Sequence, residues 1–384
     1  MKITDIKTYI AGNPWKNWLF TRVETDEGIY GIGEGTINMA TKTVESCIHD
    51  LKPQVIGMDP FQIEIILQKT VRDIYAEGGQ FHGCAVSAIE FACWDIIGKA
   101  LDKPVYDLLG GRCHEKLRCY ANGWYRGPRE PESFAEKAKD VVKRGYTALK
   151  FDPFGANWRM MMPSDEQLSL DIIAAVREAV GWDVDLLIEG HNRFSVSTAI
   201  KFGERMVEYR PAWFEEPVHH QNIGSMVEVA RHLDIPIATG ESFSSKHQFA
   251  ELLKHDAVHI LQIEPLHVGG LWAARKIADM VDAFYGVIAP HSAQGPVCSA
   301  VCAHLNIACP NFFIHEYFDE FNEPWEKEIV TGGVEPVNGY IEPPTAPGLG
   351  IDLNFEEIEK HPYASEYWLP LFKPGWERRD SAED

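Results

Sequence analysis

The chain has 384 residues, of which 45% are hydrophobic and 24% are charged. This length can bury a large core, in two domains or in one large barrel with an appendage. Its 36 Lys and Arg against 57 Asp and Glu give a formal net charge of −21. An acidic chain without a Lys/Arg-rich run is a poor partner for nucleic acid or an anionic membrane. Any anionic ligand must be held by local positive charge.

The cysteines and the N-terminal segment bear on the cellular compartment. Eight cysteines are present without a C-x-x-C pair, which argues against a structural zinc site. The opening MKITDIKTYI has no cationic stretch followed by a long apolar one, and no apolar run reaches membrane-spanning length. These features predict a protein of the reducing cytoplasm.

Residues 1–112 have the pattern of an α+β domain. A strand is expected to begin at Ile3, and TRVETDEGIYGIGEG predicts a hairpin with its turn at Asp26-Glu27-Gly28. Two helical stretches follow. The second, AVSAIEFACWDIIGKALDKPVYDLLGG, is apolar on most faces, which is typical of a helix buried between domains.

From residue 113 to 334 the pattern becomes apolar strand, loop, helix, repeated. Such alternation indicates parallel βα units, and eight of them indicate a (β/α)₈ barrel. The expected strands are Leu117–Asn122, Ala148–Phe151, Leu186–Glu189, Trp213–Glu215, Ile235–Thr239, Val258–Ile263, Val287–Pro290 and Phe312–His315. Ser133 and Glu136 suggest a capping box for the first helix. The Pro-rich tail, about 335–384, is expected to return to the first domain and complete it.

Three glutamates, Glu189, Glu215 and Glu241, stand 26 residues apart, each at the end of a short apolar run. A single carboxylate in such a loop is usually a helix cap or a solvated charge. Three at the carboxyl ends of adjacent strands cannot all stay ionised together without a cation. An oxygen-only ligand set fits Mg²⁺. Glu215 is followed by Glu216, and strand alternation lets only one of the two point into the barrel.

Two histidines fall at equivalent strand ends. His191 lies two residues past Glu189, so an extended chain would place both side chains on one face. His291 ends the seventh expected strand. Glu264, at the end of the sixth, could accept a hydrogen bond from an imidazole on the next strand and raise its basicity. Glu316 ends the eighth and could present an acid or a hydrogen-bond donor.

Lys150 and Asp152 end the second expected strand, in ALKFDPFG. We treat both as candidate substrate-binding residues. The Lys150 ammonium could steady a substrate carboxylate, or it could simply pair with Asp152; the sequence leaves both possibilities open.

These residues resemble the enolase superfamily, specifically its mandelate-racemase-like branch of acid-sugar dehydratases. The resemblance spans nearly the whole chain and includes SAIEFACWDIIGKALDKPVYDLLGG, the EEP and GES motifs and PGLG. YANGWY followed by ALKFDPFG is most similar to gluconate dehydratases, with galactonate dehydratases a step further away. The resemblance implies a capping α+β domain over a modified (β/α)₈ barrel, a Mg²⁺ cofactor, a small sugar-acid substrate and a homo-oligomer, either dimer or octamer.

The resemblance also implies roles for individual residues. The metal ligands correspond to Glu189, Glu215 and Glu241. The general base of a His–acid dyad corresponds to His291, the second histidine to His191 and the eighth-strand electrophile to Glu316. The dyad acid is usually Asp, whereas this chain has Glu264, which is one methylene longer. Relatives that racemise or cycloisomerise often carry K-x-K on the second strand; the second lysine is replaced here by Asp152, which favours elimination.

The expected reaction is abstraction of the proton α to the carboxylate by His291, followed by loss of the 3-hydroxyl with His191 as acid. The product would be a 2-keto-3-deoxy sugar acid. Two alternatives stay open: an epimerase, racemase or cycloisomerase acting through the same histidines, and a regulatory or binding protein on the same fold without catalysis.

Overall fold

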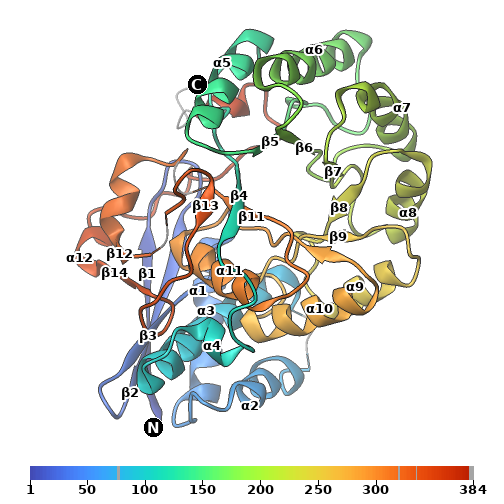
Figure 1. The fold of residues 1–384 in the computed structure, drawn as a ribbon. Coiled ribbons are helices and arrows are strands. Elements are labelled where there is room, and N and C mark those ends of the chain that lie inside the picture. The colour runs from blue at the N-terminus through green and yellow to red at the C-terminus, as the bar shows by residue number, and fades with distance from the viewer. Residues whose placement is uncertain (76–77, 319–320, 334, 380–384) are drawn as a thin grey trace.

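The computed structural model describes residues 1–75, 78–318, 321–333 and 335–379. The N-terminal part is a three-stranded antiparallel sheet in the order β1-β2-β3, covered by helices (Figure 1). The elements are β1 Ile3–Ala11, β2 Trp18–Thr25, β3 Tyr30–Glu34, α1 Thr41–Val55, α2 Ile63–Leu67, the π-helix η1 Gln68–Arg72, α3 Gly79–Leu101 and α4 Val105–Leu108. The predicted hairpin between β2 and β3 is confirmed.

The second part is a curled, mostly parallel sheet that runs β4 to β10 in chain order, with β11 beside β4. The parallel strands are β4 Leu117–Ala121, β5 Ala148–Phe151, β6 Asp185–Glu189, β7 Trp213–Glu215, β8 Ile237–Thr239, β9 Ile260–Leu261, β10 Val287–Ile288 and β11 His315–Tyr317. The helices outside them are α5 Pro131–Lys143, α6 Pro163–Val180, α7 Val196–Met206, η2 Val207–Tyr209, α8 Ile223–His232, α9 Lys246–Leu253, α10 Leu271–Ala283 and α11 Pro296–Ala308 (Figure 1). The predicted barrel with a capping domain is therefore confirmed.

The barrel closes between β10 and the segment that leads into β11. Phe312 forms a parallel bridge with Ile288, and Phe313 N donates to Ile288 O at 2.9 Å. Three residues further on, His315 pairs with Cys119 of β4. The eighth strand was predicted at 312–315 and lies at 315–317, because the chain first contacts β10 and then crosses to β4. Glu316 therefore lies inside the strand and not after it.

The predicted capping box at Ser133 and Glu136 is wrong. Helix α5 begins at Pro131, with Glu130 at its N-cap and no side-chain cap bond. Proline at the first helical position has its φ already fixed near the helical value. Ser133 therefore lies within the first turn, where its hydroxyl cannot cap the helix.

Helix α3 lies between the capping sheet and the barrel, and its residues from Gly83 to Gly98 are buried throughout, as predicted. The Glu90 carboxylate accepts the backbone N–H groups of Leu271 and Trp272 at the start of α10, each at 2.9 Å. Ser87 Oγ donates to Pro265 O at 3.0 Å. These polar bonds fix the capping helix relative to the barrel helix that follows β9.

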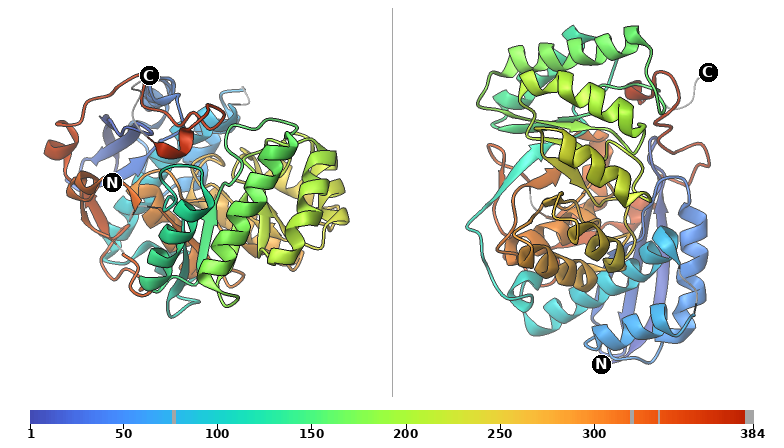
Figure 2. Two further views of the ribbon diagram at one scale, coloured as in Figure 1. Left: turned by 90° about the horizontal axis from the view of Figure 1, so that it is seen from above. Right: turned by 90° about the vertical axis from the view of Figure 1, so that its right-hand side faces the viewer.

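The C-terminal segment contacts both parts of the molecule. Its elements are η4 Pro324–Ile329, β12 Val330–Gly332, β13 Tyr340–Ile341, β14 Ile351–Leu353, α12 Phe355–Ile358 and η5 Trp376–Arg378. β13 pairs with β4, whereas Gly12 N donates to His361 O at 2.7 Å. In Figure 2 this segment, in red, crosses between the capping sheet and the first barrel helices. None of the helices in the described residues is long and apolar enough to span a membrane.

Candidate active site

Strand alternation places the polar side chains of the site one pleat beyond an apolar plug. The plug inside the barrel consists of Tyr120, Ala148, Leu187, Trp213, Ala238, Ala289 and Ile314, all buried. Side chains two positions apart in a strand share a face. The residues two positions beyond six of these are Asn122, Lys150, Glu189, Glu215, His291 and Glu316. The sequence thus places a layer of charged and polar side chains, the charged layer, directly above the apolar plug.

The three glutamates converge in this layer. Oxygen atoms of Glu189, Glu215 and Glu241 all lie within 4.8 Å of one another. Glu189 Oε2 is buried and accepts no hydrogen bond from any residue that the structure describes. Glu215 Oε2 accepts from the Trp213 indole N–H at 2.8 Å, which orients the carboxylate. The donor set is all oxygen, as Mg²⁺ prefers.

The electrostatics of the cluster call for a cation. Burial, with the Glu241 carboxylate nearby, raises the pKa of Glu189 to about 7. Burial and Glu189 raise the pKa of Glu215 well above its ordinary value. Burial opposes ionisation of Glu241 as well, but His291, Lys150 and His191 together hold its pKa below the usual value. Carboxylates that repel in this way are ionised together when a divalent ion lies between them. The glutamate oxygens therefore fit a Mg²⁺ site.

Lys150 lies among the carboxylates and not beside Asp152. Its ammonium is 2.7 Å from Glu215 Oε1, 2.9 Å from Glu316 Oε1 and 3.6 Å from Glu189 Oε2. Burial disfavours its charge, yet these neighbours raise the pKa of Lys150 well above its ordinary value. Of the two roles left open for Lys150, the pairing with Asp152 does not form, since Asp152 Oδ1 accepts Phe154 N at 2.8 Å and its Oδ2 faces His191.

His291 and Glu264 form the predicted pair. His291 Nδ1 lies 2.6 Å from Glu264 Oε2, and His291 Nε2 lies 3.5 Å from Glu241 Oε2. Burial disfavours the imidazolium, but Glu241, Glu316 and Glu264 raise the pKa of His291 to about 10. β10 ends at Ile288, before His291, yet His291 N still donates to Ile263 O at 3.1 Å. The backbone ladder thus holds the imidazole at the required depth.

His191 reaches the cavity through a tight turn. The premise of an extended chain from Glu189 is wrong, because His191 and Asn192 adopt φ values of 44° and 60°. In this turn His191 N donates to Glu189 Oε1 at 2.6 Å. His191 Nδ1 lies 2.7 Å from Asp152 Oδ2, and the Arg193 guanidinium also pairs with Asp152. Asp152 is buried, so it supports His191 where a contact with substrate had been expected.

Glu316 is held from three sides. Asn122 Nδ2 donates to its Oε1 at 2.8 Å and Ser292 N donates to its Oε2 at 2.7 Å, in addition to the Lys150 contact. Burial opposes ionisation, but Lys150 and His291 lower the pKa of Glu316 to about 2. Glu316 is therefore a fixed anion in this arrangement.

Glu216 faces away from the metal cluster, as the alternation rule predicted. It adopts φ 37° and accepts hydrogen bonds from Thr239 Oγ1 at 3.0 Å and Ser242 Oγ at 2.8 Å. Its carboxylate thus braces the two loops beside the site.

A cavity joins the charged layer to the capping domain and to the C-terminal segment. Besides Lys150, His191, Glu241 and His291, it is lined by residues that include Trp15, Lys16, Gln80, Phe81, Asn122, Tyr125, His267, Gln294, Phe318, Leu369, Leu371, Trp376 and Arg379. Trp15, Gln80 and Phe81 bring the N-terminal part of the chain to the wall of this cavity. Asn122 could have been found by extending the strand alternation to β4. Lys16 and Arg379 carry no signal in the sequence that marks them as site residues.

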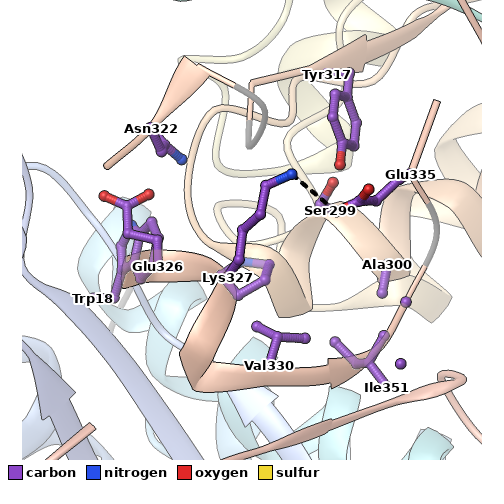
Figure 3. Close-up of a pocket in the computed structure, with 13 residues that line it drawn as sticks. Trp18, Ser299, Ala300, Tyr317, Asn322, Glu326, Lys327, Val330, Glu335 and Ile351 are labelled. Atoms are coloured by element: carbon purple, nitrogen blue, oxygen red, sulfur yellow. Dashed lines mark hydrogen bonds and ion pairs between the residues drawn. The ribbon is translucent and has the colours of Figure 1, made fainter. Parts of the chain in front are cut away.

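A second cavity lies outside the barrel and has a different character. Tyr317, Ser299 and Trp18 line it, and Lys327 Nζ forms a 3.1 Å ion pair with Glu335 at its edge (Figure 3). Tyr317 and Glu316 are adjacent in β11, so their side chains face opposite sides of the strand. The three-glutamate cluster belongs to the first cavity alone within the described ranges.

Two family models match the chain. Residues 7–110 match the N-terminal domain of mandelate racemase/muconate lactonizing enzymes, and residues 133–358 match the enolase C-terminal domain-like model. The chain belongs to the mandelate racemase/muconate lactonizing enzyme branch of the enolase superfamily.

The chain is similar to several named dehydratases of this branch. It is 34% identical to a D-gluconate/D-galactonate dehydratase of Picrophilus torridus, over 95% of this chain and 93% of the relative. It is 34% identical to a D-gluconate dehydratase of Thermoproteus tenax, over 90% of this chain and 70% of the relative. A D-galactonate dehydratase of Ralstonia pickettii is 32% identical, over 97% of this chain and 98% of the relative.

Solved structures of this branch share the fold. A mandelate racemase/muconate lactonizing enzyme-like protein from Roseovarius sp. TM1035 superposes with a TM-score of 0.90 at 33% identity, covering 95% of this chain and 96% of that one. A putative dehydratase from Mesorhizobium loti gives 0.90 at 31% identity, covering 95% and 99%.

Proposed function

We propose that this protein is a Mg²⁺-dependent acid-sugar dehydratase that converts an aldonic or related sugar acid into a 2-keto-3-deoxy acid. The observation that carries the proposal is the arrangement in one cavity of three convergent glutamates and two histidines, each histidine paired with a buried carboxylate. The similarity to D-gluconate and D-galactonate dehydratases over nearly the whole chain supports the substrate class.

Mg²⁺ would be held by Glu189, Glu215 and Glu241 and, when bound, would supply a Lewis acid for the substrate carboxylate. Lys150 lies against two of these glutamates, so its ammonium adds positive charge next to that carboxylate. A proton α to a carboxylate becomes accessible to a histidine base only when the negative charge that develops is stabilised in this way.

His291 is proposed as the base. Its Nδ1 is bonded to Glu264, so Nε2 is the nitrogen that faces the cavity. Glu241 is the largest charge that raises the pKa of His291, so a Mg²⁺ ion on Glu241 would lower this pKa and leave Nε2 free to take the C2 proton. The additional methylene of Glu264 does not prevent the pair from forming, since the contact is 2.6 Å. Leu266 N donates to the other Glu264 oxygen at 3.0 Å and fixes the carboxylate.

His191 is proposed as the acid that protonates the departing 3-hydroxyl. Asp152 accepts from its Nδ1 side and is itself paired with Arg193, so the imidazole is fixed with Nε2 available to substrate. Hydroxide is a poor leaving group, so the elimination requires this proton. The enol that results tautomerises to the 2-keto acid.

The experiment combines two histidine variants with isotope exchange. In D₂O with Mg²⁺, His291→Asn should lose both α-proton exchange and dehydration, whereas His191→Asn should keep exchange and lose the 2-keto product. Product is measured by a colour reaction for 2-keto-3-deoxy acids. Normal dehydration by His191→Asn would refute the acid assignment, and absence of exchange with every acid of an aldonic and aldaric panel would favour a non-catalytic binding protein.

An epimerase is the second candidate, and one observation favours it. Both histidines are backed by a carboxylate and line one cavity, an arrangement that two opposed bases would also need. An epimerase would give exchange at C2 and a C2 epimer without 2-keto acid. The same assay therefore separates the two reactions.

We also propose a division of the chain into a capping domain, residues 1–112 completed by about 335–384, and a barrel, residues 113–334. Hydrogen bonds between the tail and the N-terminal part support it, such as Asn17 Nδ2 to Ala364 O at 2.7 Å. The pairing of β13 with β4 shows that part of the tail also lies on the barrel.

A further inference from the structure

Arg379, the last residue that the structure describes, is held by aromatic rings at the candidate active site. Its guanidinium carbon lies 4.8 Å from the ring centre of Trp15, 5.0 Å from that of Phe318 and 5.5 Å from that of Tyr125. The rings of Trp15 and Phe318 are themselves stacked, with centres 4.7 Å apart. Contact with the faces of aromatic rings stabilises a cation and limits its rotation. All four residues line the cavity that contains Lys150 and both histidines.

The guanidinium has unused hydrogen-bonding capacity. Arg379 Nε is buried and has no hydrogen-bond partner within the described chain. Burial lowers the pKa of Arg379, and Tyr125 only partly offsets this. The Tyr125 hydroxyl supplies one hydrogen-bond partner to the guanidinium, whereas the ring faces cannot accept its in-plane N–H groups as oxygen atoms do. An oxygen atom of a ligand bound in the cavity would satisfy Nε.

The tail that carries Arg379 is fixed over the cavity. Asn38 and Leu369 exchange two hydrogen bonds, Asn38 Nδ2 to Leu369 O at 3.1 Å and Leu369 N to Asn38 Oδ1 at 2.9 Å. Gly127 N donates to Glu377 O at 3.0 Å, which attaches the end of the tail to the barrel. Figure 2 shows the tail crossing from one part to the other. Arg379 is therefore presented by an anchored segment.

Arg379 and the metal ligands reach the cavity from different parts of the chain, the ligands from the barrel strands and Arg379 from the C-terminal tail. The carboxylates and Lys150 form the charged layer above the apolar plug. Arg379 instead contacts rings from the loop before β2, from the loop after β4 and from the residue after β11. Tyr125 responds to charges of both regions: burial raises the pKa of its hydroxyl, Arg379 opposes the rise, and Asp152 and Glu189 add to it. A sugar acid with its reacting carboxylate at the glutamates would extend toward Arg379.

We propose that Arg379 binds the end of the sugar acid distal to the reacting carboxylate, donating hydrogen bonds to terminal hydroxyl oxygens or to a second carboxylate. This inference rests on the proposed dehydratase function. It makes the C-terminal tail a determinant of substrate selection.

The test compares Arg379→Gln and Arg379→Lys with wild type, using Mg²⁺ and paired aldonic and aldaric acids of equal chain length. Arg378→Gln is the matched control, because the Arg378 side chain is exposed and its contact with Arg126 is made by the backbone carbonyl. Arg379→Gln should raise KM roughly ten- to a hundredfold with little change in kcat, as expected for loss of a charged hydrogen-bond donor. Arg379→Lys should recover part of the loss.

The two acid classes identify the bound group. A larger loss for the aldaric acid assigns a carboxylate to Arg379, and a larger loss for the aldonic acid assigns hydroxyl groups. An unchanged KM in a folded Arg379→Gln protein, with wild type active, overturns the inference and leaves the dehydratase function standing. A wild-type protein that exchanges and dehydrates none of the acids overturns the proposed function, and this inference with it.

Discussion

Replacing Lys150 by Met tests whether the buried carboxylates need a counter-charge. The Lys150 ammonium is within 2.7–3.6 Å of Glu215, Glu316 and Glu189, and all four side chains are at most 2% exposed. Removing one member of a buried ion pair typically costs about 3–5 kcal/mol, because the remaining charge is left uncompensated. Methionine has nearly the same length as lysine, so the substitution leaves little empty space and costs little free energy through a cavity. We therefore expect the free energy of unfolding of metal-free Lys150→Met to be about 3–5 kcal/mol lower than that of metal-free wild type near pH 7.5.

The sign of the pH effect follows from the carboxylates. Without Lys150 the pKa values of Glu189 and Glu215 rise further above those of the unfolded chain, and the lowered pKa of Glu316 rises as well. The folded variant therefore binds more protons than folded wild type. Stability then decreases as pH rises through the range between the two pKa values. The difference between the variant and wild type should accordingly shrink when the pH is lowered toward 5.5.

Magnesium supplies the second half of this test. A ligand at a hundred times its Kd stabilises the folded state by about 2.7 kcal/mol. Because Mg²⁺ and Lys150 neutralise the same carboxylates, Mg²⁺ should stabilise Lys150→Met by more than it stabilises wild type. The assay is urea unfolding with and without Mg²⁺. Lys143→Met is the control, since Lys143 forms an exposed surface pair with Asp140. Equal stability of the metal-free proteins within about 1 kcal/mol would refute the reasoning.

Three further predictions concern single contacts. Glu264→Asp should lower kcat at least about tenfold, because the shorter side chain withdraws from His291 Nδ1 and the 2.6 Å contact is lost. Steady-state kinetics measures kcat, with Glu228→Asp as the control variant. A gain in kcat would contradict the prediction. Burial lowers the pKa of His304 from 6.5 to about 4, so between these pH values the unfolded chain binds one more proton and stability falls as pH drops. His304→Gln should reduce this pH dependence of the free energy of unfolding by up to about 1.4 kcal/mol per pH unit, measured by denaturant titration at several pH values. An unchanged pH dependence would count against the prediction. Gly33→Ala should lower the free energy of unfolding by at least about 2 kcal/mol, since the new Cβ would lie 1.9 Å from Ala88 O of helix α3. Thermal unfolding compares it with Gly224→Ala, whose Cβ would meet Asn222 Oδ1 at an ordinary 3.5 Å. Equal melting temperatures would show that the interface can adjust.

Much of the metal site followed from the sequence because a parallel barrel gives strand ends a common face. The apolar runs before Glu189, Glu215 and Glu241 predicted strands, and the carboxyl ends of parallel strands meet at one face of the barrel. The same reasoning placed Glu264 beside His291. These predictions follow from the alternation of side chains along a strand and from the repeated order of strand and helix. Both patterns can be recognised in short stretches of the sequence.

The environment of each of these groups was decided by the tertiary structure. Lys150 pairs with Glu215 and Glu316 and not with Asp152, because a turn after β5 directs the Asp152 carboxylate to His191 and Arg193. Local spacing cannot show this, since the partners come from other strands.

By itself the sequence determined which side chains enter the charged layer of the barrel, since alternation along each strand is a local property. Only the tertiary structure decided what covers that layer. Trp15 and Arg379 are 364 positions apart in the chain, yet their side chains are in contact at one cavity. Such a contact depends on how the capping sheet and the C-terminal tail pack against the barrel, and no local pattern encodes that packing.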